Sequence, residues 1–250
     1  MSAVAAEFLG TMILVLLGNG VVANVVLDKT KGNQAGWIVI ATGWAIAVFV
    51  GALCSAEASG AHLNPAVTVA MAIAGKMESN LIAGYILAQM AGAIVGGGLV
   101  YCFYRNHFNV TEDADAKLAC FCTAPNIRGS LQSLFCEAIG TFVLILPILL
   151  IQNPTIANIT GTDPSKPAML GMGTLGLLPV ALIVFGIGLS LGGTTGYAIN
   201  PARDLGPRIA HALLPISGKR DSDWSYAWIP VAGPILGAVA AALLFIAIGS

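Results

Sequence analysis

Six long apolar stretches constrain the fold of this chain more than any other feature. A helix needs about 20 apolar residues to cross a hydrocarbon core of about 30 Å. Stretches of that length occupy residues 4–26, 36–56, 81–104, 131–152, 170–191 and 228–249. Only 9% of the 250 residues are charged, against about 25% in an ordinary soluble domain. Because lipid cannot satisfy exposed backbone groups, these stretches are predicted to be transmembrane helices of an all-α protein.

Charge and cysteine usage exclude several classes of partner. The formal net charge is −1 and there is no basic run, so no nucleic-acid partner is predicted. Five cysteines are scattered without a CxxC pair, which favours buried apolar cysteines and predicts neither a metal site nor a cofactor. The first apolar stretch has no positive region or cleavage site, so it is interpreted as a retained span.

The chain repeats itself at a fixed spacing. The segment from Glu7 to Thr11 returns from Glu137 to Thr141, and residues 91–96 return as 232–237. Each half holds three spans, so the second half must enter the membrane from the opposite face. We therefore predict a single domain over 1–250, with inverted halves 1–108 and 131–250 joined by a loop at 109–130.

Two further apolar segments, at 65–75 and 201–212, reach only half way across a bilayer. Each begins with the same tripeptide, which reads Asn64-Pro65-Ala66 in the first half and Asn200-Pro201-Ala202 in the second. Asn favours the N-cap and Pro the first helical position. A single Asn-Pro pair would indicate only a turn. Two copies at matching places predict half-helices that meet end to end at the membrane centre.

The meeting point of these half-helices has the chemistry of a pore for neutral solutes. Two helix N-termini, each worth roughly +0.5 charge, repel cations there. The preceding segments, 55–63 and 191–199, are rich in small residues, and such non-helical backbone is tolerated where it lines an aqueous cavity. Their carbonyls are predicted acceptors, and Asn64, Asn200 and Arg203 are predicted donors.

A resemblance to a known family covers essentially the whole chain. It is carried by two motifs: 59–68 (Ser-Gly-Ala-His-Leu-Asn-Pro-Ala-Val-Thr) and 196–204 (Gly-Tyr-Ala-Ile-Asn-Pro-Ala-Arg-Asp). The chain resembles the major intrinsic proteins, the family of aquaporins and glycerol facilitators. The resemblance implies an aquaporin-like fold with six transmembrane helices and two re-entrant half-helices. It also implies a homotetramer in the cell membrane, a passive channel and no enzymatic activity.

By motif offset, the resemblance places the narrowest point of the pore at Trp44, Gly188, Tyr197 and Arg203. Water-selective members have His at the position of Gly188 and Phe at that of Trp44, so a wider opening for glycerol is expected here. Glycerol-conducting members commonly have Phe at the position of Tyr197. Undissociated lactic acid, dihydroxyacetone, urea or mainly water therefore stay open as alternative solutes.

Four other residues are expected to support the pore loops by resemblance: Glu7, Glu137, His62 and Asp204. Proton coupling by the two glutamates, as in a secondary transporter, is the alternative, but their symmetric placement favours a scaffold. Arg203 could instead pair with Asp204. The ring of His62, or only its carbonyl, could reach the lumen. The spans contain no Ser–His, metal-ligand or paired-Asp constellation, which disfavours an intramembrane enzyme.

The orientation of the chain is predicted differently by charge and by resemblance. Connections after the odd-numbered spans carry most of the loop cations: Lys29, Lys31, Arg105, Lys117, Arg128, Lys219 and Arg220. The positive-inside rule would then place both termini outside. The resemblance places both in the cytoplasm, and we follow it because the paired motifs are more specific than loop charge.

Overall fold

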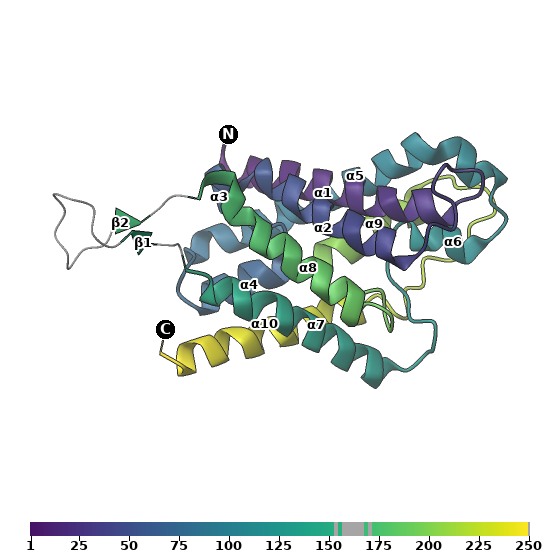
Figure 1. Ribbon diagram of the computed structural model, residues 1–250. Helices are drawn as coiled ribbons and strands as arrows, with labels where there is room; N and C mark the ends of the chain where they lie inside the picture. The colour runs from purple at the N-terminus through teal and green to yellow at the C-terminus, as the bar shows by residue number, and fades with distance from the viewer. Residues whose placement is uncertain (153–154, 157–167, 170–171, 250) are drawn as a thin grey trace.

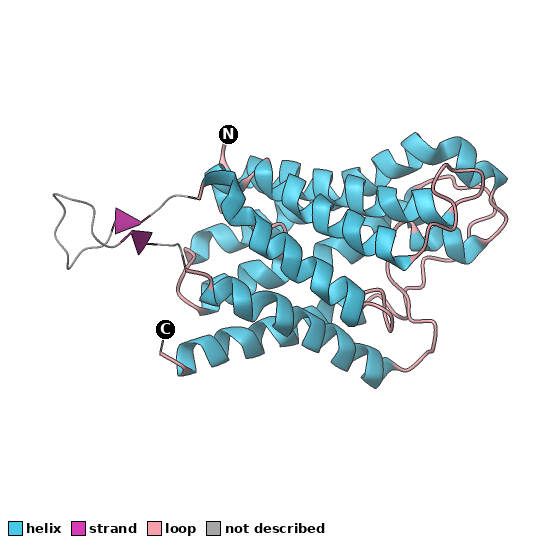
Figure 2. Ribbon diagram, in the orientation of Figure 1, coloured by secondary structure: helices cyan, strands magenta, loops and turns pink. Residues whose placement is uncertain are grey.

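The computed structural model describes residues 1–152, 155–156, 168–169 and 172–249. Figures 1 and 2 show that helices dominate this part of the chain. The long helices are α1 (Ala3–Val26), α2 (Trp37–Leu53), α5 (Ile82–Val110), α7 (Ser130–Leu150), α8 (Leu178–Ser190) and α10 (Ile229–Ala247). The short ones are α3 (Ala56–Ser59), α4 (Pro65–Ile73), α6 (Ala114–Ala119) and α9 (Pro201–Leu213), with 3₁₀ turns η1 (Ser79–Leu81) and η2 (Gly173–Leu177).

Each predicted span contains a helix among the described residues, with corrected bounds. Five described helical segments are long and apolar enough to cross a membrane, and α2 is an apolar helix of 17 residues. The stretch predicted at 170–191 becomes α-helical only at Leu178, after η2, and its residues 170–171 lie outside the described part. Two-residue strands β1 (Thr155–Ile156) and β2 (Ala168–Met169) pair antiparallel ahead of it.

The connection predicted at 109–130 is not entirely a loop. Helix α5 continues to Val110, and α6 forms inside the connection because the Asp113 carboxylate accepts the N–H groups of Asp115 and Ala116. The predicted half-helix at 65–75 ends earlier, at Ile73. Gly75 has a φ of 70° there, and the Lys76 N–H donates to the Met71 carbonyl at 2.8 Å. This is a glycine C-cap.

Helix pairing follows the inverted repeat. Helix α1 packs on α5 as α7 packs on α10, and α2 packs on α8. Each half-helix packs mainly on the last span of the other half, α4 on α10 and α9 on α5. Both chain termini lie at one end of the bundle and α6 at the other (Figure 1). The half-helices therefore join the two halves at the centre of the molecule.

Glycines allow the two main helix pairs to approach closely, as the small-residue spacing in 81–104 and 228–249 predicts. A Cβ on Gly92 would lie 2.3 Å from the Phe8 carbonyl oxygen, and one on Gly237 would lie 2.1 Å from that of Ala138. The prediction for cysteines is only partly right. Cys120 and Cys122 are buried in the loop after α6, whereas Cys102 is exposed on the outer face of α5.

Candidate functional site

The two half-helices meet through their cap residues. Asn64 accepts the Ala66 N–H at 2.9 Å, and Asn200 accepts those of Ala202 and Arg203 at 3.0 and 3.2 Å. The two amide groups also cross to the opposite half. Asn64 Nδ2 donates to the Ile199 carbonyl and Asn200 Nδ2 to that of Leu63, both at 2.8 Å. One amide hydrogen on each asparagine thus remains available to a solute.

The other residues of the tripeptides form the first turns of the half-helices. Pro65, Ala66, Pro201 and Ala202 are all buried. The prolines have no N–H that would need a partner at this position. The structure thus places both tripeptides at one central point, as the repeat predicts.

The segments that lead into the half-helices have matching strained backbones. Ala61 and Leu63 have positive φ angles of 54° and 50°. Tyr197 and Ile199, at equivalent places in the second half, have φ angles of 37° and 46°. Non-glycine residues seldom adopt this conformation, and it persists only where surrounding contacts hold it.

Two fully buried glutamates supply those contacts. Glu7 accepts the N–H groups of His62 and Leu63 at 2.9 and 2.7 Å, and the Ser59 hydroxyl at 2.6 Å. Glu137 repeats the pattern with the N–H groups of Ala198 and Ile199, at 3.0 and 2.8 Å, and the Thr195 hydroxyl, at 2.7 Å. The carboxylates thus bind backbone N–H groups, and they act on the carbonyls only indirectly.

The carbonyls are oriented because each N–H is bound. In a trans peptide the C=O points opposite to the N–H of the next residue. The carbonyls of Ala61, His62, Tyr197 and Ala198 therefore point away from the glutamates. All four residues line a cavity of about 130 Å³, together with Asn64 and Asn200. The arrangement yields a row of acceptors along that cavity.

A second cavity, of about 200 Å³, lies beyond the first. The two cavities share three lining residues, Trp44, Tyr197 and Arg203. The guanidinium carbon of Arg203 lies 3.9 Å from the centre of the Trp44 ring, a cation–π distance. Arg203 Nη1 is buried and has no partner among the described residues. These three side chains separate the two cavities and form a constriction.

Gly188 lies behind this constriction and does not line either cavity. A Cβ added there would lie 3.1 Å from Tyr197 Cζ and from its hydroxyl oxygen. The space left by the missing side chain is thus occupied by the Tyr197 ring, so Gly188 affects the opening through the position of that ring and not by lining it. The carbonyl of Gly188 accepts the indole N–H of Trp37 at 2.8 Å, and Trp37 packs edge-on to Tyr197.

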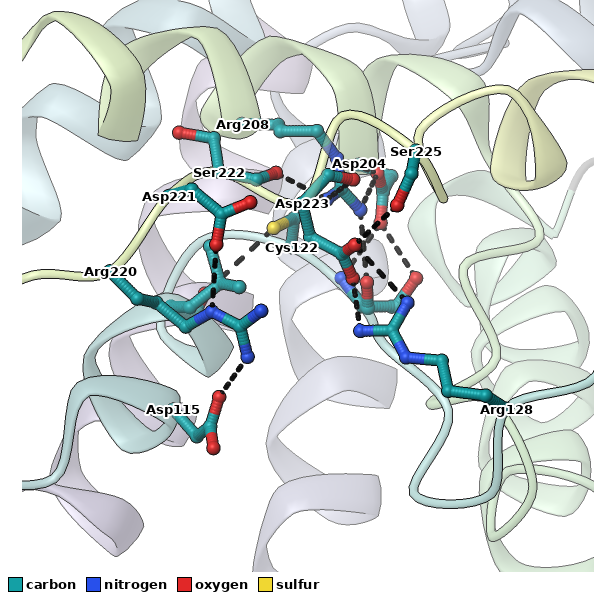
Figure 3. Close-up of polar contacts among 12 residues, drawn as sticks. Asp115, Cys122, Arg128, Asp204, Arg208, Arg220, Asp221, Ser222, Asp223 and Ser225 are labelled. Atoms are coloured by element: carbon teal, nitrogen blue, oxygen red, sulfur yellow. Dashed lines mark hydrogen bonds and ion pairs between the residues drawn. The ribbon is translucent and has the colours of Figure 1, made fainter.

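Asp204 does not pair with Arg203. Its Oδ1 pairs with Arg208 Nη2 at 2.8 Å, and its Oδ2 accepts the N–H and hydroxyl of Thr123 at 2.7 and 2.6 Å. Arg208 also donates to the carbonyls of Ser222 and Thr123, at 2.7 and 2.9 Å (Figure 3). Sequence reasoning did not identify Arg208 and Thr123. The four-residue spacing of Asp204 and Arg208 on α9 was the available signal.

The same polar cluster continues to the loop that precedes α7. Arg128 binds both carboxylate oxygens of Asp223, at 3.1 and 2.6 Å (Figure 3). Burial by itself raises the pKa of Asp223, but hydrogen bonds and charge from Arg128 outweigh it and leave that pKa below its usual range. This cluster holds together three segments: 120–128 and α9, which both contribute to the lining of the second cavity, and 214–228.

His62 also lines the first cavity, and its Nε2 is not among the buried unpartnered atoms of the described residues. Its Nδ1 lies 3.1 Å from the Thr68 hydroxyl oxygen, and the ring packs edge-on to Tyr85.

Comparison with known proteins agrees with this architecture. Residues 1–245 match the family described as "Major intrinsic protein". The chain is 52% identical to a Thermotoga maritima protein described as "probable glycerol uptake facilitator protein" and 51% identical to the glycerol uptake facilitator protein of Streptococcus pneumoniae, with 98% of each chain covered in both cases.

A solved structure, the aquaglyceroporin from Plasmodium falciparum, superposes with a TM-score of 0.80 at 33% identity. The match covers 97% of this chain and 93% of that one. The paired half-helices, the full-length family match and these relatives lead to one conclusion. The chain belongs to the major intrinsic protein family and is a membrane channel rather than an enzyme.

Proposed function

We propose that this channel conducts glycerol and other small uncharged solutes, together with water, passively across the cell membrane. The observation that carries the proposal is the constriction between the two cavities. Trp44 and Tyr197 contribute aromatic rings there, and Arg203 contributes a guanidinium group. A polyol has the matching asymmetry, with hydroxyls along one edge and C–H groups along the other. The curated names of the relatives support glycerol as the solute.

Passage is a sequence of hydrogen-bond exchanges. A hydroxyl oxygen accepts from Arg203 at the constriction and then from the free amide hydrogens of Asn64 and Asn200. Hydroxyl hydrogens donate in turn to the carbonyls that Glu7 and Glu137 orient. Each bond replaces one made to water, so the solute crosses without a large desolvation penalty. In this mechanism the glutamates are scaffold groups, because their oxygens are already occupied by loop donors.

We also propose that the pore excludes ions and protons. The N-termini of α4 and α9 meet at the centre, where their dipoles oppose cations. Arg203 adds a full positive charge at the constriction. An anion such as lactate would have to shed its water in a narrow apolar passage, which is costly for a full charge.

Stopped-flow light scattering of proteoliposomes tests the proposal. An inward glycerol gradient should cause shrinkage followed by rapid reswelling with a low activation energy, faster than in empty liposomes. Parallel gradients of urea, dihydroxyacetone and lactic acid below its pKa rank the alternative solutes. Shrinkage without reswelling would identify a mainly water-selective pore and refute the proposal. Uphill accumulation of solute driven by an ion gradient would instead indicate a transporter.

Assembly and orientation are part of the proposal. A homotetramer with one pore per subunit and cytoplasmic termini follow from the family resemblance. Native mass spectrometry in mild detergent should show four copies.

Reporter fusions test the orientation. A fluorescent protein fused after Ser250 should fluoresce in a bacterial host, whereas alkaline phosphatase fused at the same place should be inactive. The opposite pattern would support the orientation predicted from loop charge.

A further inference from the structure

A chain of buried hydrogen bonds links Glu7 to the ring of His62. Gln89 Nε2 donates to Glu7 Oε2 at 2.7 Å and to the Thr68 hydroxyl oxygen at 3.0 Å. That hydroxyl oxygen lies 3.1 Å from His62 Nδ1. Glu7, Gln89 and Thr68 are all fully buried. His62 is the one member of this chain that lines the first cavity.

The donors and acceptors in this chain have a defined direction. Four donors converge on Glu7, so its carboxylate acts only as an acceptor. Gln89 must therefore direct its NH₂ group to Glu7, and its second hydrogen reaches Thr68. The Thr68 hydroxyl accepts that hydrogen and needs an acceptor for its own. Among the described residues, His62 Nδ1 is the acceptor within reach.

This direction determines the tautomer of His62. With Nδ1 as the acceptor, a neutral ring carries its proton on Nε2. The other tautomer would leave the Thr68 hydroxyl hydrogen buried without an acceptor, which is unfavourable. Nε2 has no partner among the described residues and is not one of their buried unpartnered atoms. Its N–H is therefore free to donate into the cavity.

The second half of the repeat shows that this chain is not needed to hold the loop. Glu137 binds its loop through the equivalents of three of the Glu7 donors, and the described part of the chain supplies it with no fourth donor. By the repeat alignment, Ala198, Asp204 and Pro230 stand where the first half has His62, Thr68 and Gln89. The second loop nevertheless adopts matching left-handed residues. The Gln89–Thr68–His62 chain is thus an addition to the scaffold.

We propose that Gln89 and Thr68 are positioning residues that fix the tautomer of His62, and that His62 Nε2–H is a specificity-determining donor to the permeating solute. His62, Asn64 and Asn200 all line the first cavity, so a solute held by the asparagines is also within the cavity that His62 lines. The ligand class is a small hydroxylated or carbonyl-bearing neutral molecule. The permeability part of this proposal rests on the proposed function, whereas the tautomer part does not.

Nitrogen-15 NMR of the histidine rings, in liposomes at pH 7, tests the tautomer directly. The chain has three histidines, and a His62→Asn variant identifies the His62 signals. The wild-type His62 ring should be protonated at Nε2 alone. Thr68→Ala should give a mixture of tautomers, and Thr68→Ser should restore the wild-type spectrum. Thr42→Ala, at an exposed threonine on α2, is the matched control and should change nothing.

Permeability of the same variants tests the role in selectivity. Thr68→Ala and His62→Leu should lower glycerol permeability about two- to tenfold, as expected for one neutral hydrogen bond. Water permeability should change less, and Thr68→Ser should restore glycerol flux. A wild-type ring protonated at Nδ1, or a Thr68→Ala variant with unchanged tautomer and selectivity, would overturn the inference. Absence of glycerol flux in wild type with the Nε2 tautomer present would refute only the proposed solute.

Discussion

At the residue scale, the constriction depends on small residues behind its side chains. Trp44 lies against Gly18 of α1, where a Cβ would come within 2.2 Å of the indole ring. Tyr197 lies against Gly188 and also against Gly192, where a Cβ would be 2.5 Å from the ring. None of these glycines needs to touch a solute. They determine the pore width by determining where the two aromatic rings can pack.

Gly188→Ala should narrow the pore. The new methyl group would lie 3.1 Å from Tyr197 Cζ and from Ala41 Cβ, so the Tyr197 ring has to move slightly away from α8. We expect glycerol permeability to fall roughly tenfold, with a smaller loss for water, because a displaced ring excludes the larger solute first. Stopped-flow reswelling measures both. Gly186→Ala on the same helix meets nothing within 4 Å and is the matched control. Equal effects of the two changes would contradict this account.

Glu137→Gln should weaken the second pore loop. The amide has one acceptor oxygen, so its NH₂ group must face the N–H of Ala198 or Ile199. A bond to a charged acceptor contributes about 1.5–3 kcal/mol, and an unsatisfied buried donor adds a cost. We expect lower thermal stability in detergent and reduced glycerol flux. Glu112→Gln, at an exposed site, is the control and should behave as wild type.

At the element scale, the two halves are built from the same helix pair used twice. The α1–α5 and α7–α10 pairs both rely on glycines that bring one backbone onto another. In lipid, apolar surface alone does not drive helices together, so close packing of this kind is the main attraction. Each half-helix then packs on the last span of the opposite half, α4 on α10 and α9 on α5. A change in one helix pair is therefore transmitted to the pore centre of the other half.

Gly237→Ala should destabilise the α7–α10 pair. Its Cβ would lie 2.1 Å from the Ala138 carbonyl oxygen, which is backbone and cannot rotate away. Overpacking of this kind costs about 1–3 kcal/mol. We expect a lower unfolding temperature by scanning fluorimetry and weaker glycerol flux, since α4 packs on α10. Gly98→Ala on α5 meets nothing within 4 Å and should be neutral. An unchanged unfolding temperature for Gly237→Ala would contradict this packing account.

At the scale of the whole molecule, one polar cluster joins segments distant in the sequence. Asp204 and Arg208 on α9 bind the loop at 120–128, and Arg128 binds Asp223 in the loop before α10 (Figure 3). Asp204 and Arg208 are fully buried, and breaking such a pair costs about 3–5 kcal/mol because one charge is left unpaired. The cluster therefore holds these three segments together, and through Thr123 it reaches the lining of the second cavity.

The Arg128–Asp223 pair should make stability depend on pH. The folded pKa of Asp223 lies below the ordinary value of 3.8, so its contribution is complete above that value and is lost as pH falls through the folded pKa. Asp223→Asn should lower the unfolding temperature at pH 7, and the difference from wild type should vanish at strongly acidic pH. Asp221→Asn, at an exposed neighbour, is the control. A difference that persists at low pH would exclude this ionisation as its origin.

The sequence by itself determined the features that depend on local chemistry. Apolar stretches of bilayer length must be helical because lipid offers no other partner for the backbone. Asn before Pro caps a helix wherever it occurs, and the repeat determined that two such caps face one another. These features fixed the spans, the half-helices and the central asparagines. The family resemblance added Glu7 and Glu137 as expected loop supports, and their matching places in the repeat favoured a scaffold over proton coupling.

Only the tertiary structure decided which distant side chains pack together. Asp204 binds Arg208 and Thr123 instead of its neighbour Arg203, whose Nη1 is buried without a partner among the described residues. Tyr197 fills the space beside Gly188. The physical reason is the same in both cases. Each outcome depends on the distance between segments far apart in the chain, and that distance is set by helix packing, which composition and local motifs do not specify.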